Sequence, residues 1–175
     1  LNSRFCYLDC KNSPDFDHPH ALICIKNTVL VNKFDKYNPS RENLGIYLDI
    51  FPLDYAPDDS ELQDKQESEL LWIKKLKKLK VGTLHQKSFL KKAVKGVIKR
   101  SIFWTTVNKL NEKMDICMRK YNESETSYLC SMASHYSYKK QCMPKEIYGT
   151  PKLLEFENRM YYAPEETEKY LTRIY

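Results

Sequence analysis

The chain has 175 residues, of which 42% are hydrophobic and 13% aromatic, and its 29 basic against 23 acidic side chains give a net charge of +6. This length and apolar content suffice for one hydrophobic core and exclude a disordered polymer. Since no stretch approaches the roughly 20 consecutive apolar residues that a bilayer-crossing helix needs, the sequence predicts no membrane span.

The first residues, the cysteines and the two chain ends bear on where the protein works. The N-terminal residues lack the basic start and apolar centre of a signal peptide, so we expect a cytoplasmic protein. Six cysteines without a secretory segment favour reduced thiols over a disulfide framework. Because the chain begins with Leu1 and stops at Tyr175 within a helix-like run, we expect a fragment that is truncated at both ends.

The N-terminal third predicts three strands. Two are expected over Phe5–Leu8 and Ala21–Val31, separated by a polar stretch that Pro14 and Pro19 interrupt. The apolar, β-prone segment from Gly45 to Pro52 predicts a third, buried strand that ends at the proline.

The middle third is predicted to be helical. Asp58, Asp59 and Ser60 have the residue types of a helix start, and apolar residues follow at helical spacing up to Gly82. Two further helices are expected over residues 85–101 and 104–121. The expected helical region therefore covers about residues 59–122.

The C-terminal third returns to short strands, expected over Tyr128–Met132 and Leu153–Tyr162. Pro164 then begins a last helix that has acidic residues near its positive end. This order of elements predicts an α/β or α+β fold in a single domain over residues 1–175.

Asp49 is the most informative residue because it stands inside the apolar segment from Gly45 to Pro52. When such a strand packs, its acid must face water or be compensated, and a metal ion is one compensator. The alternation of a strand puts Asp49 on the same face as Tyr47 and Phe51. An edge strand whose acid is simply solvated is the alternative.

The segment Gly-Ile-Tyr-Leu-Asp-Ile-Phe-Pro-Leu-Asp, Gly45 to Asp54, closely resembles the signature of the LicD family of phosphotransferases, which has fukutin-type glycan-modifying enzymes among its relatives. Further along, Phe156-Glu157, Ala163-Pro164 and the run from Tyr170 to Tyr175 resemble the closing pattern of that family. The two matches occur in the family's order.

The resemblance implies a nucleotidyltransferase-like mixed sheet with a helical insertion, in which acids on neighbouring strands hold a divalent metal against the phosphates of a nucleotide. Asp49 would be the catalytic, metal-binding carboxylate, and Asp54 a second, weaker metal ligand that otherwise shapes the turn. Hard oxygen ligands suit Mg²⁺ or Mn²⁺, and such an ion neutralises phosphate charge during group transfer.

The N-terminal acidic cluster of the family has no counterpart between Leu1 and Asn43. The only nearby D-x-D is Asp15-Phe-Asp17, whose setting does not match and favours a solvated loop. We therefore expect the acidic cluster upstream of Leu1, and we expect this fragment to be inactive by itself.

Three further residues occupy positions that the resemblance makes relevant. Lys26 and Thr28 stand where the family has a basic residue and a threonine, so they are candidates for binding the donor phosphate, with a merely solvated lysine as the alternative. Glu157 stands where the family has an acid, and its role is either chemical or structural.

A group of cysteines and histidines near the N-terminus has residue types that bind zinc. Their spacing lacks the paired C-x2-C units of zinc ribbons, which favours core or surface thiols. The residues of this group are Cys6, Cys10, His18, His20 and Cys24.

The positive charge is concentrated between Leu70 and Asn111, a segment without acidic residues. Its lysine-rich helices have apolar residues interleaved, a pattern that favours contact with an anionic membrane leaflet and equally fits a solvated helix face over a core stripe. Nucleic-acid binding ranks lower because no known motif surrounds the lysines.

Together these observations predict an enzyme that transfers phosphocholine, or a related phospho-substituent, from a CDP-choline-like donor to a surface glycan such as lipopolysaccharide or teichoic acid. The acceptor glycan would be either free or linked to a lipid. A lipid-linked acceptor would place the enzyme in peripheral contact with the inner face of the membrane. The alternative is a non-catalytic basic module that keeps the fold and binds a membrane surface or a glycan.

Overall fold

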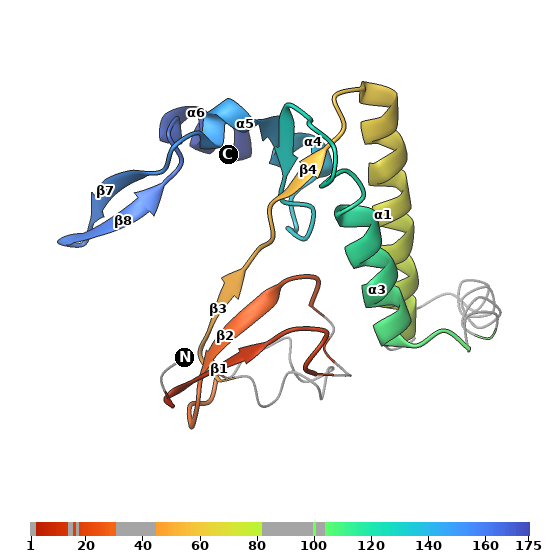
Figure 1. Ribbon diagram of the computed structural model, residues 1–175. Helices are drawn as coiled ribbons and strands as arrows, with labels where there is room; N and C mark the ends of the chain where they lie inside the picture. Colours follow the sequence, from red (N-terminus) through yellow and green to blue (C-terminus); the bar gives the residue numbers. More distant parts are fainter. Residues whose placement is uncertain (1–2, 14–15, 17, 31–44, 82–99, 101–103) are drawn as a thin grey trace. The chain divides into compact units, whose positions relative to one another are not determined.

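The computed structural model describes residues 3–13, 16, 18–30, 45–81, 100 and 104–175 (Figure 1). Over these residues the protein has an α+β fold with five helices and three small sheets, and every described strand pair is antiparallel. The sheets seen here are therefore not mixed, and the nucleotidyltransferase-like arrangement stays a prediction. The helix expected over residues 85–101 lies, apart from Arg100, outside the described residues.

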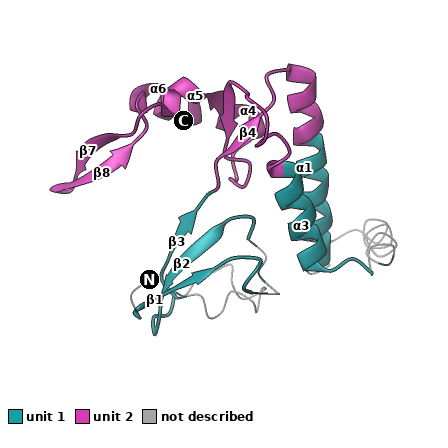
Figure 2. Ribbon diagram, viewed as in Figure 1, with its two compact units in different colours: residues 1–51, 68–117 teal, residues 52–67, 118–175 magenta. Residues whose placement is uncertain are grey.

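The described chain divides into two compact units, coloured separately in Figure 2. The first comprises residues 1–51 and 68–117, and the second comprises residues 52–67 and 118–175. The long helix α1 (Ser60–Val81) contributes residues to both units. That the whole chain is one domain stays a prediction.

The first unit contains an antiparallel sheet with the strand order β1-β2-β3. Its strands are β1 (Phe5–Leu8), β2 (Ala21–Ile25) and β3 (Tyr47–Ile50), which confirms the three strands expected in this part of the chain. Strand β2 ends earlier than expected because Asn27 adopts a positive φ of 59° in the turn that follows.

The core of the first sheet is a small apolar cluster made of Phe16, Leu22 and Cys24, each at most 5% exposed. Helix α3 (Val107–Met118) is tied to it, since the buried Asn111 side chain donates a hydrogen bond of 2.8 Å to the Phe16 carbonyl. This bond satisfies a backbone carbonyl that is removed from water, which fixes the loop after β1.

The turn after β2 depends on Gly45 and Thr28. The Thr28 hydroxyl donates to the Ile25 carbonyl (2.7 Å) and accepts from the Ile46 amide (2.8 Å). Gly45 has a φ of +62°, and a Cβ there would lie 2.5 Å from the Thr28 Oγ1 and 2.8 Å from the Thr28 carbonyl oxygen. The backbone therefore approaches Thr28 more closely than a side chain at position 45 would allow.

Replacing Gly45 with alanine is expected to lower the free energy of unfolding by at least about 2 kcal/mol, because it adds a strained positive φ to a steric clash. Urea denaturation followed by circular dichroism measures the change. The matched control is Asn27→Gly in the same turn, which keeps a positive φ without strain and should change stability by less than about 0.5 kcal/mol. Equal stability of Gly45→Ala and wild type would contradict this account of the turn.

Helix α1 starts as the sequence predicts. The Asp59 carboxylate accepts a hydrogen bond of 2.9 Å from the Leu62 amide, which satisfies one of the free donors at the helix start. Leu70 and Ile73 are buried, as expected for the apolar face, whereas Leu62 is 38% exposed.

The described lysines of the basic region lie on α1 and, at Lys109, on α3. One lysine on α1 has an unexpected environment. Lys77 is only 7% exposed, so it does not belong to a solvated face. Among the described helices, none combines the length and apolarity needed to cross a bilayer.

The second unit is built around the sheet β4-β5-β6. Its strands are β4 (Asp54–Ala56), β5 (Tyr128–Cys130) and β6 (Cys142–Pro144). The short helices α4 (Tyr138–Gln141) and α5 (Lys145–Tyr148) were not expected, and neither were the strands β4 and β6, because four-residue helices and three-residue strands leave too little periodicity to detect. A buried hydrogen bond of 2.6 Å from the Tyr138 hydroxyl to Gln66 joins α4 to the start of α1.

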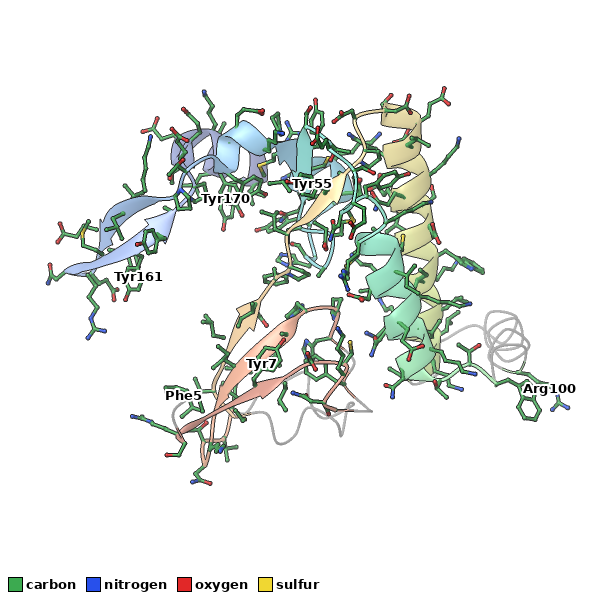
Figure 3. The ribbon with its side chains drawn as sticks, viewed as in Figure 1. Phe5, Tyr7, Tyr55, Arg100, Tyr161 and Tyr170 are labelled. Atoms are coloured by element: carbon green, nitrogen blue, oxygen red, sulfur yellow. The ribbon has the colours of Figure 1, made fainter. Side chains whose placement is uncertain are left out.

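The C-terminal segment forms a hairpin and a helix. Strands β7 (Lys152–Phe156) and β8 (Arg159–Ala163) pair around a turn in which Glu157 and Asn158 have φ values of 49° and 60°. These two residues split the strand segment expected over Leu153–Tyr162. The last helix, α6 (Thr167–Ile174), confirms the expected terminal helix (Figure 3, where Tyr161 marks the hairpin and Tyr170 marks α6).

Candidate functional site

The strand that carries Asp49 is an edge strand within the described residues, where β3 pairs with β2 alone. The expectation of a buried strand is wrong, since Leu48 is 66% and Ile50 38% exposed. Leu48 and Ile50 point to the face of the sheet opposite the Phe16 cluster, and the edge strand has a neighbouring strand on one side only. The Asp49 side chain is 41% exposed, so water solvates part of its charge.

The pairing register decides which residues lie near Asp49. Asp49 lies opposite Leu22, and Tyr47 lies opposite Cys24. Directly opposite residues project from the same face of a sheet, so Asp49 shares a face with Tyr47, as the alternation predicts. Asp49 is thus the polar member of the face that otherwise packs on the Phe16 cluster.

His20 is the partner of Asp49. Its Nε2 lies 2.8 Å from the Asp49 Oδ1, and its ring packs on Phe51 with a centroid distance of 4.3 Å. His20 immediately precedes β2, whose first residue, Ala21, pairs with Ile50. The sheet register therefore brings together a histidine and an acid that are 29 residues apart in the sequence.

Aromatic rings hold His20 in a defined orientation. Phe16 and His18 have centroids 5.2 Å apart, and His18 and His20 are also 5.2 Å apart in an edge-to-face arrangement. His20 is only 11% exposed, and its Nδ1 is buried with no hydrogen-bond partner among the described residues. With Nε2–H donating to the carboxylate, the neutral ring would carry its lone pair on Nδ1.

The Asp49–His20 pair leaves one carboxylate oxygen available. Oδ1 is engaged by His20, while no hydrogen bond from a described residue reaches Oδ2. An exposed carboxylate with one open oxygen fits a single hard-cation ligand, since Mg²⁺ usually takes one or two protein carboxylates and completes its shell with water and phosphate. In the described part of the chain, no three histidine, cysteine, aspartate or glutamate side chains gather as a ready-made metal site.

Asp54 lies in a different environment from Asp49, in the β4-β5-β6 sheet of the second unit. Only 6% exposed, it accepts a hydrogen bond of 2.8 Å from the Asn122 amide through Oδ1. The Asn122 side-chain oxygen in turn accepts from the Tyr55 backbone amide at 2.9 Å (Tyr55 is labelled in Figure 3). Among described residues the Asp54 Oδ2 is buried without a partner, a state that a bound cation or a donor would relieve.

Replacing Asn122 with alanine is expected to cost about 1–3 kcal/mol of unfolding free energy, because the buried Asp54 carboxylate loses its donor and the Tyr55 amide loses its acceptor. Thermal and urea denaturation measure the loss. Glu123→Ala, at the exposed neighbouring position, is the control and should be nearly neutral. A neutral Asn122→Ala would contradict the role assigned to this side chain.

The other residues singled out in the sequence lie as follows. Lys26 is exposed, and its backbone amide donates to the Arg4 carbonyl at 3.0 Å. The Thr28 hydroxyl is used within the turn, which leaves it no second proton to donate to a phosphate. Asp15 and Asp17 lie outside the described residues. Glu157 is in the hairpin turn.

Among the residues that the structure describes, no three members of the cysteine and histidine group come together as a metal site. Cys6 lies directly opposite Cys24 in the β1–β2 ladder, with the Cys6 Sγ 3.8 Å from the Cys24 carbonyl oxygen. Burial is the main cause that raises the pKa of Cys24 to about 11 and also raises that of Cys10. The raised pKa lowers the fraction of reactive thiolate at these two residues at neutral pH.

The coupling between His20 and Asp49 is expected to be small, at most about 1 kcal/mol, because Asp49 is well exposed and water screens the pair. A double-mutant cycle with His20→Gln, Asp49→Asn and the double variant measures it by urea denaturation. The same cycle at Lys169 and Glu166, an exposed i,i+3 pair 3.1 Å apart on α6, is the reference and should give about 0.5 kcal/mol or less. Strict additivity at His20 and Asp49 would show that the contact does not orient the carboxylate.

His20 is the residue that sequence reasoning missed as a partner of Asp49. From the sequence, His20 was considered only as a possible zinc ligand together with the cysteines. The one local sign of its pairing with Asp49 is its position just before a β-prone segment. No protein-family model, curated protein or solved structure matched this chain when it was compared with all three.

Proposed function

We propose that this chain belongs to a LicD-type phosphotransferase that moves phosphocholine, or a related phospho-substituent, from a CDP-linked donor to a hydroxyl of a surface glycan. The proposal starts from the resemblance of Gly45–Asp54 to the family signature. The observation that carries it is the placement of Asp49, which the edge strand β3 exposes to solvent and which His20 orients. An acid placed in this way is available to a ligand while its backbone stays rigid.

The proposed role of Asp49 is to hold Mg²⁺ or Mn²⁺ through its open oxygen. When bound, the ion would neutralise charge on the phosphate oxygens during transfer. His20 supports this role by fixing one oxygen of Asp49, so that the other points away from the imidazole. Its stacking on Phe51 restricts the ring further, which limits the entropy lost when a ligand binds.

Lys26 and Thr28 support the Asp49 site in different ways, and Asp54 is a separate candidate. Lys26 supplies an exposed positive charge on the turn after β2, suited to a donor phosphate as a point charge. Asp54, in the second unit, is the weaker cation-ligand candidate: its Oδ1 accepts a hydrogen bond from Asn122, and its buried Oδ2 has no partner among the described residues. Thr28 stabilises the turn that carries Lys26 and is proposed to act through that turn.

The test is release of CMP from CDP-choline by the full gene product that carries this chain, with Mg²⁺ and either a lipopolysaccharide or a teichoic acid acceptor. Asp49→Asn keeps the shape of the side chain and removes the charge that binds the ion, so release should fall by at least about 100-fold. The matched control, Glu155→Gln, neutralises an exposed acid on β7 and should leave the rate unchanged.

The outcomes separate the two functions considered from the sequence. Metal-dependent release that Asp49→Asn abolishes and Glu155→Gln preserves supports the transferase and the role of Asp49. Absence of release by the wild-type gene product with both glycans and with several CDP-linked donors overturns the transferase. Binding of that inactive protein to anionic vesicles or to the glycans would then identify a non-catalytic module.

A further inference from the structure

Four of the six cysteines form two pairs, each directly opposite across an antiparallel ladder. Cys6 faces Cys24 between β1 and β2, and Cys130 faces Cys142 between β5 and β6. The six cysteines, all of them among the described residues, form no disulfide in the structure. The two pairs differ in how well their geometry and surroundings suit the formation of a disulfide.

The hydrogen-bond pattern distinguishes the two pairs. The Lys145 amide donates to the Ser127 carbonyl at 2.9 Å, so by alternation along the ladder Cys130 and Cys142 form a non-hydrogen-bonded pair. In agreement, the Cys142 amide donates to the Tyr138 carbonyl and not across the strands. Residues in such pairs have Cα atoms about 4.5 Å apart and side chains close together.

The other pair has the opposite pattern. The Lys26 amide donates to the Arg4 carbonyl at 3.0 Å, which makes Cys6 and Cys24 a hydrogen-bonded pair by the same alternation. The Cα atoms of such pairs are about 5.5 Å apart, and their side chains diverge more. Both separations fall in the range that disulfides span, but the closer side chains favour Cys130 and Cys142.

The surroundings of Cys142 also favour reaction. The Arg173 guanidinium donates to the Cys142 carbonyl at 2.9 Å, which places a fixed positive charge beside the residue. A hydrogen bond from Cys130 and the charge of Arg173 lower the pKa of Cys142 against the opposing effect of burial. Cys24 has the reverse balance, because burial raises its pKa to about 11.

We propose that Cys130 and Cys142 are a redox modification site that closes to an intramolecular cross-strand disulfide when the protein meets hydrogen peroxide. Both residues are at most 2% exposed, which selects a small oxidant over a bulky disulfide. The Cys142 thiolate attacks one peroxide oxygen, breaking the O–O bond and giving a sulfenic acid and hydroxide, which takes up the proton released by the thiol. The Cys130 sulfur then attacks the Cys142 sulfur, and the sulfenic oxygen leaves as water with the Cys130 proton.

The product would join β5 to β6 and enclose residues 131–141, which include α4. In balance, two thiols and one peroxide give one disulfide and two waters, with each sulfur oxidised by one electron. Since the cross-link restricts the unfolded chain, oxidation is expected to raise the melting temperature of the second unit. This inference goes beyond the proposed transfer reaction and does not depend on it.

The experiment treats the full chain with hydrogen peroxide, blocks remaining thiols by alkylation in denaturant, and identifies cross-linked and alkylated peptides by mass spectrometry. The expected product is the Cys130–Cys142 cross-linked peptide. It should form at least about tenfold faster than any Cys6–Cys24 cross-link, because each unit of pKa difference changes the thiolate fraction about tenfold. Cys117, a buried cysteine on α3, is the internal control and should stay alkylated.

Variants identify the order of the two steps. Cys130→Ser should accumulate a sulfenic acid at Cys142 that a dimedone probe captures, whereas Cys142→Ser should give neither cross-link nor probe adduct. The wild-type measurement decides the proposal even where a variant fails to fold. Cross-linking of Cys6 to Cys24 at an equal or faster rate, or oxidation of Cys130 and Cys142 without a link between them, would overturn it.

Discussion

The antiparallel pairing of β2 with β3 is the constraint on which the candidate site depends. With Leu22 opposite Asp49 and Cys24 opposite Tyr47, the side chains of Leu22, Cys24 and Tyr47 share the face that packs on Phe16. A slip of β3 by one residue would turn Tyr47 away from that face, so packing of Tyr47 against the cluster favours the observed register. The same register sets His20 beside Asp49, because His20 is the residue just before β2.

This register places Asp49 between packed aromatic rings on one side and solvent on the other. On one side, the aromatic rings of His18, His20 and Phe51 restrict motion and exclude water, and on the other the Asp49 side chain is exposed. A carboxylate in such a position keeps its orientation without being buried, which avoids the large desolvation cost of an acid in the core. The edge strand thus combines rigidity with access, as a ligand site requires.

In the second unit, Asn122 stabilises the buried carboxylate of Asp54. A carboxylate that is 6% exposed needs a donor, and Asn122 supplies one while its oxygen accepts the Tyr55 amide. One side chain therefore satisfies both a buried charge and a strand backbone. The neighbouring ladder brings Cys130 opposite both Asp54 and Cys142, so this small sheet concentrates the reactive side chains of its unit.

The local sequence determined most of the regular elements, because their signals lie within a few residues. The start of α1 follows from Asp59, and the strand around Asp49 follows from a run of β-prone residues. Single-turn helices and three-residue strands carry too weak a periodic signal to predict, which explains why the sequence did not indicate α4, α5, β4 and β6. The split of the last strand segment into a hairpin depends on positive φ angles at Glu157 and Asn158, which the residue types alone do not require.

The sequence by itself singled out Asp49, since an acid in an apolar segment is conspicuous wherever it packs, and Asp54 entered as a weaker candidate through the family resemblance. Only the tertiary structure decided that β3 is an edge strand, that His20 pairs with Asp49 and that Asn122 holds Asp54. These contacts join residues 29 and 68 positions apart. Strand pairing and core burial select such partners, and neither leaves a local signal in the residues that they bring together.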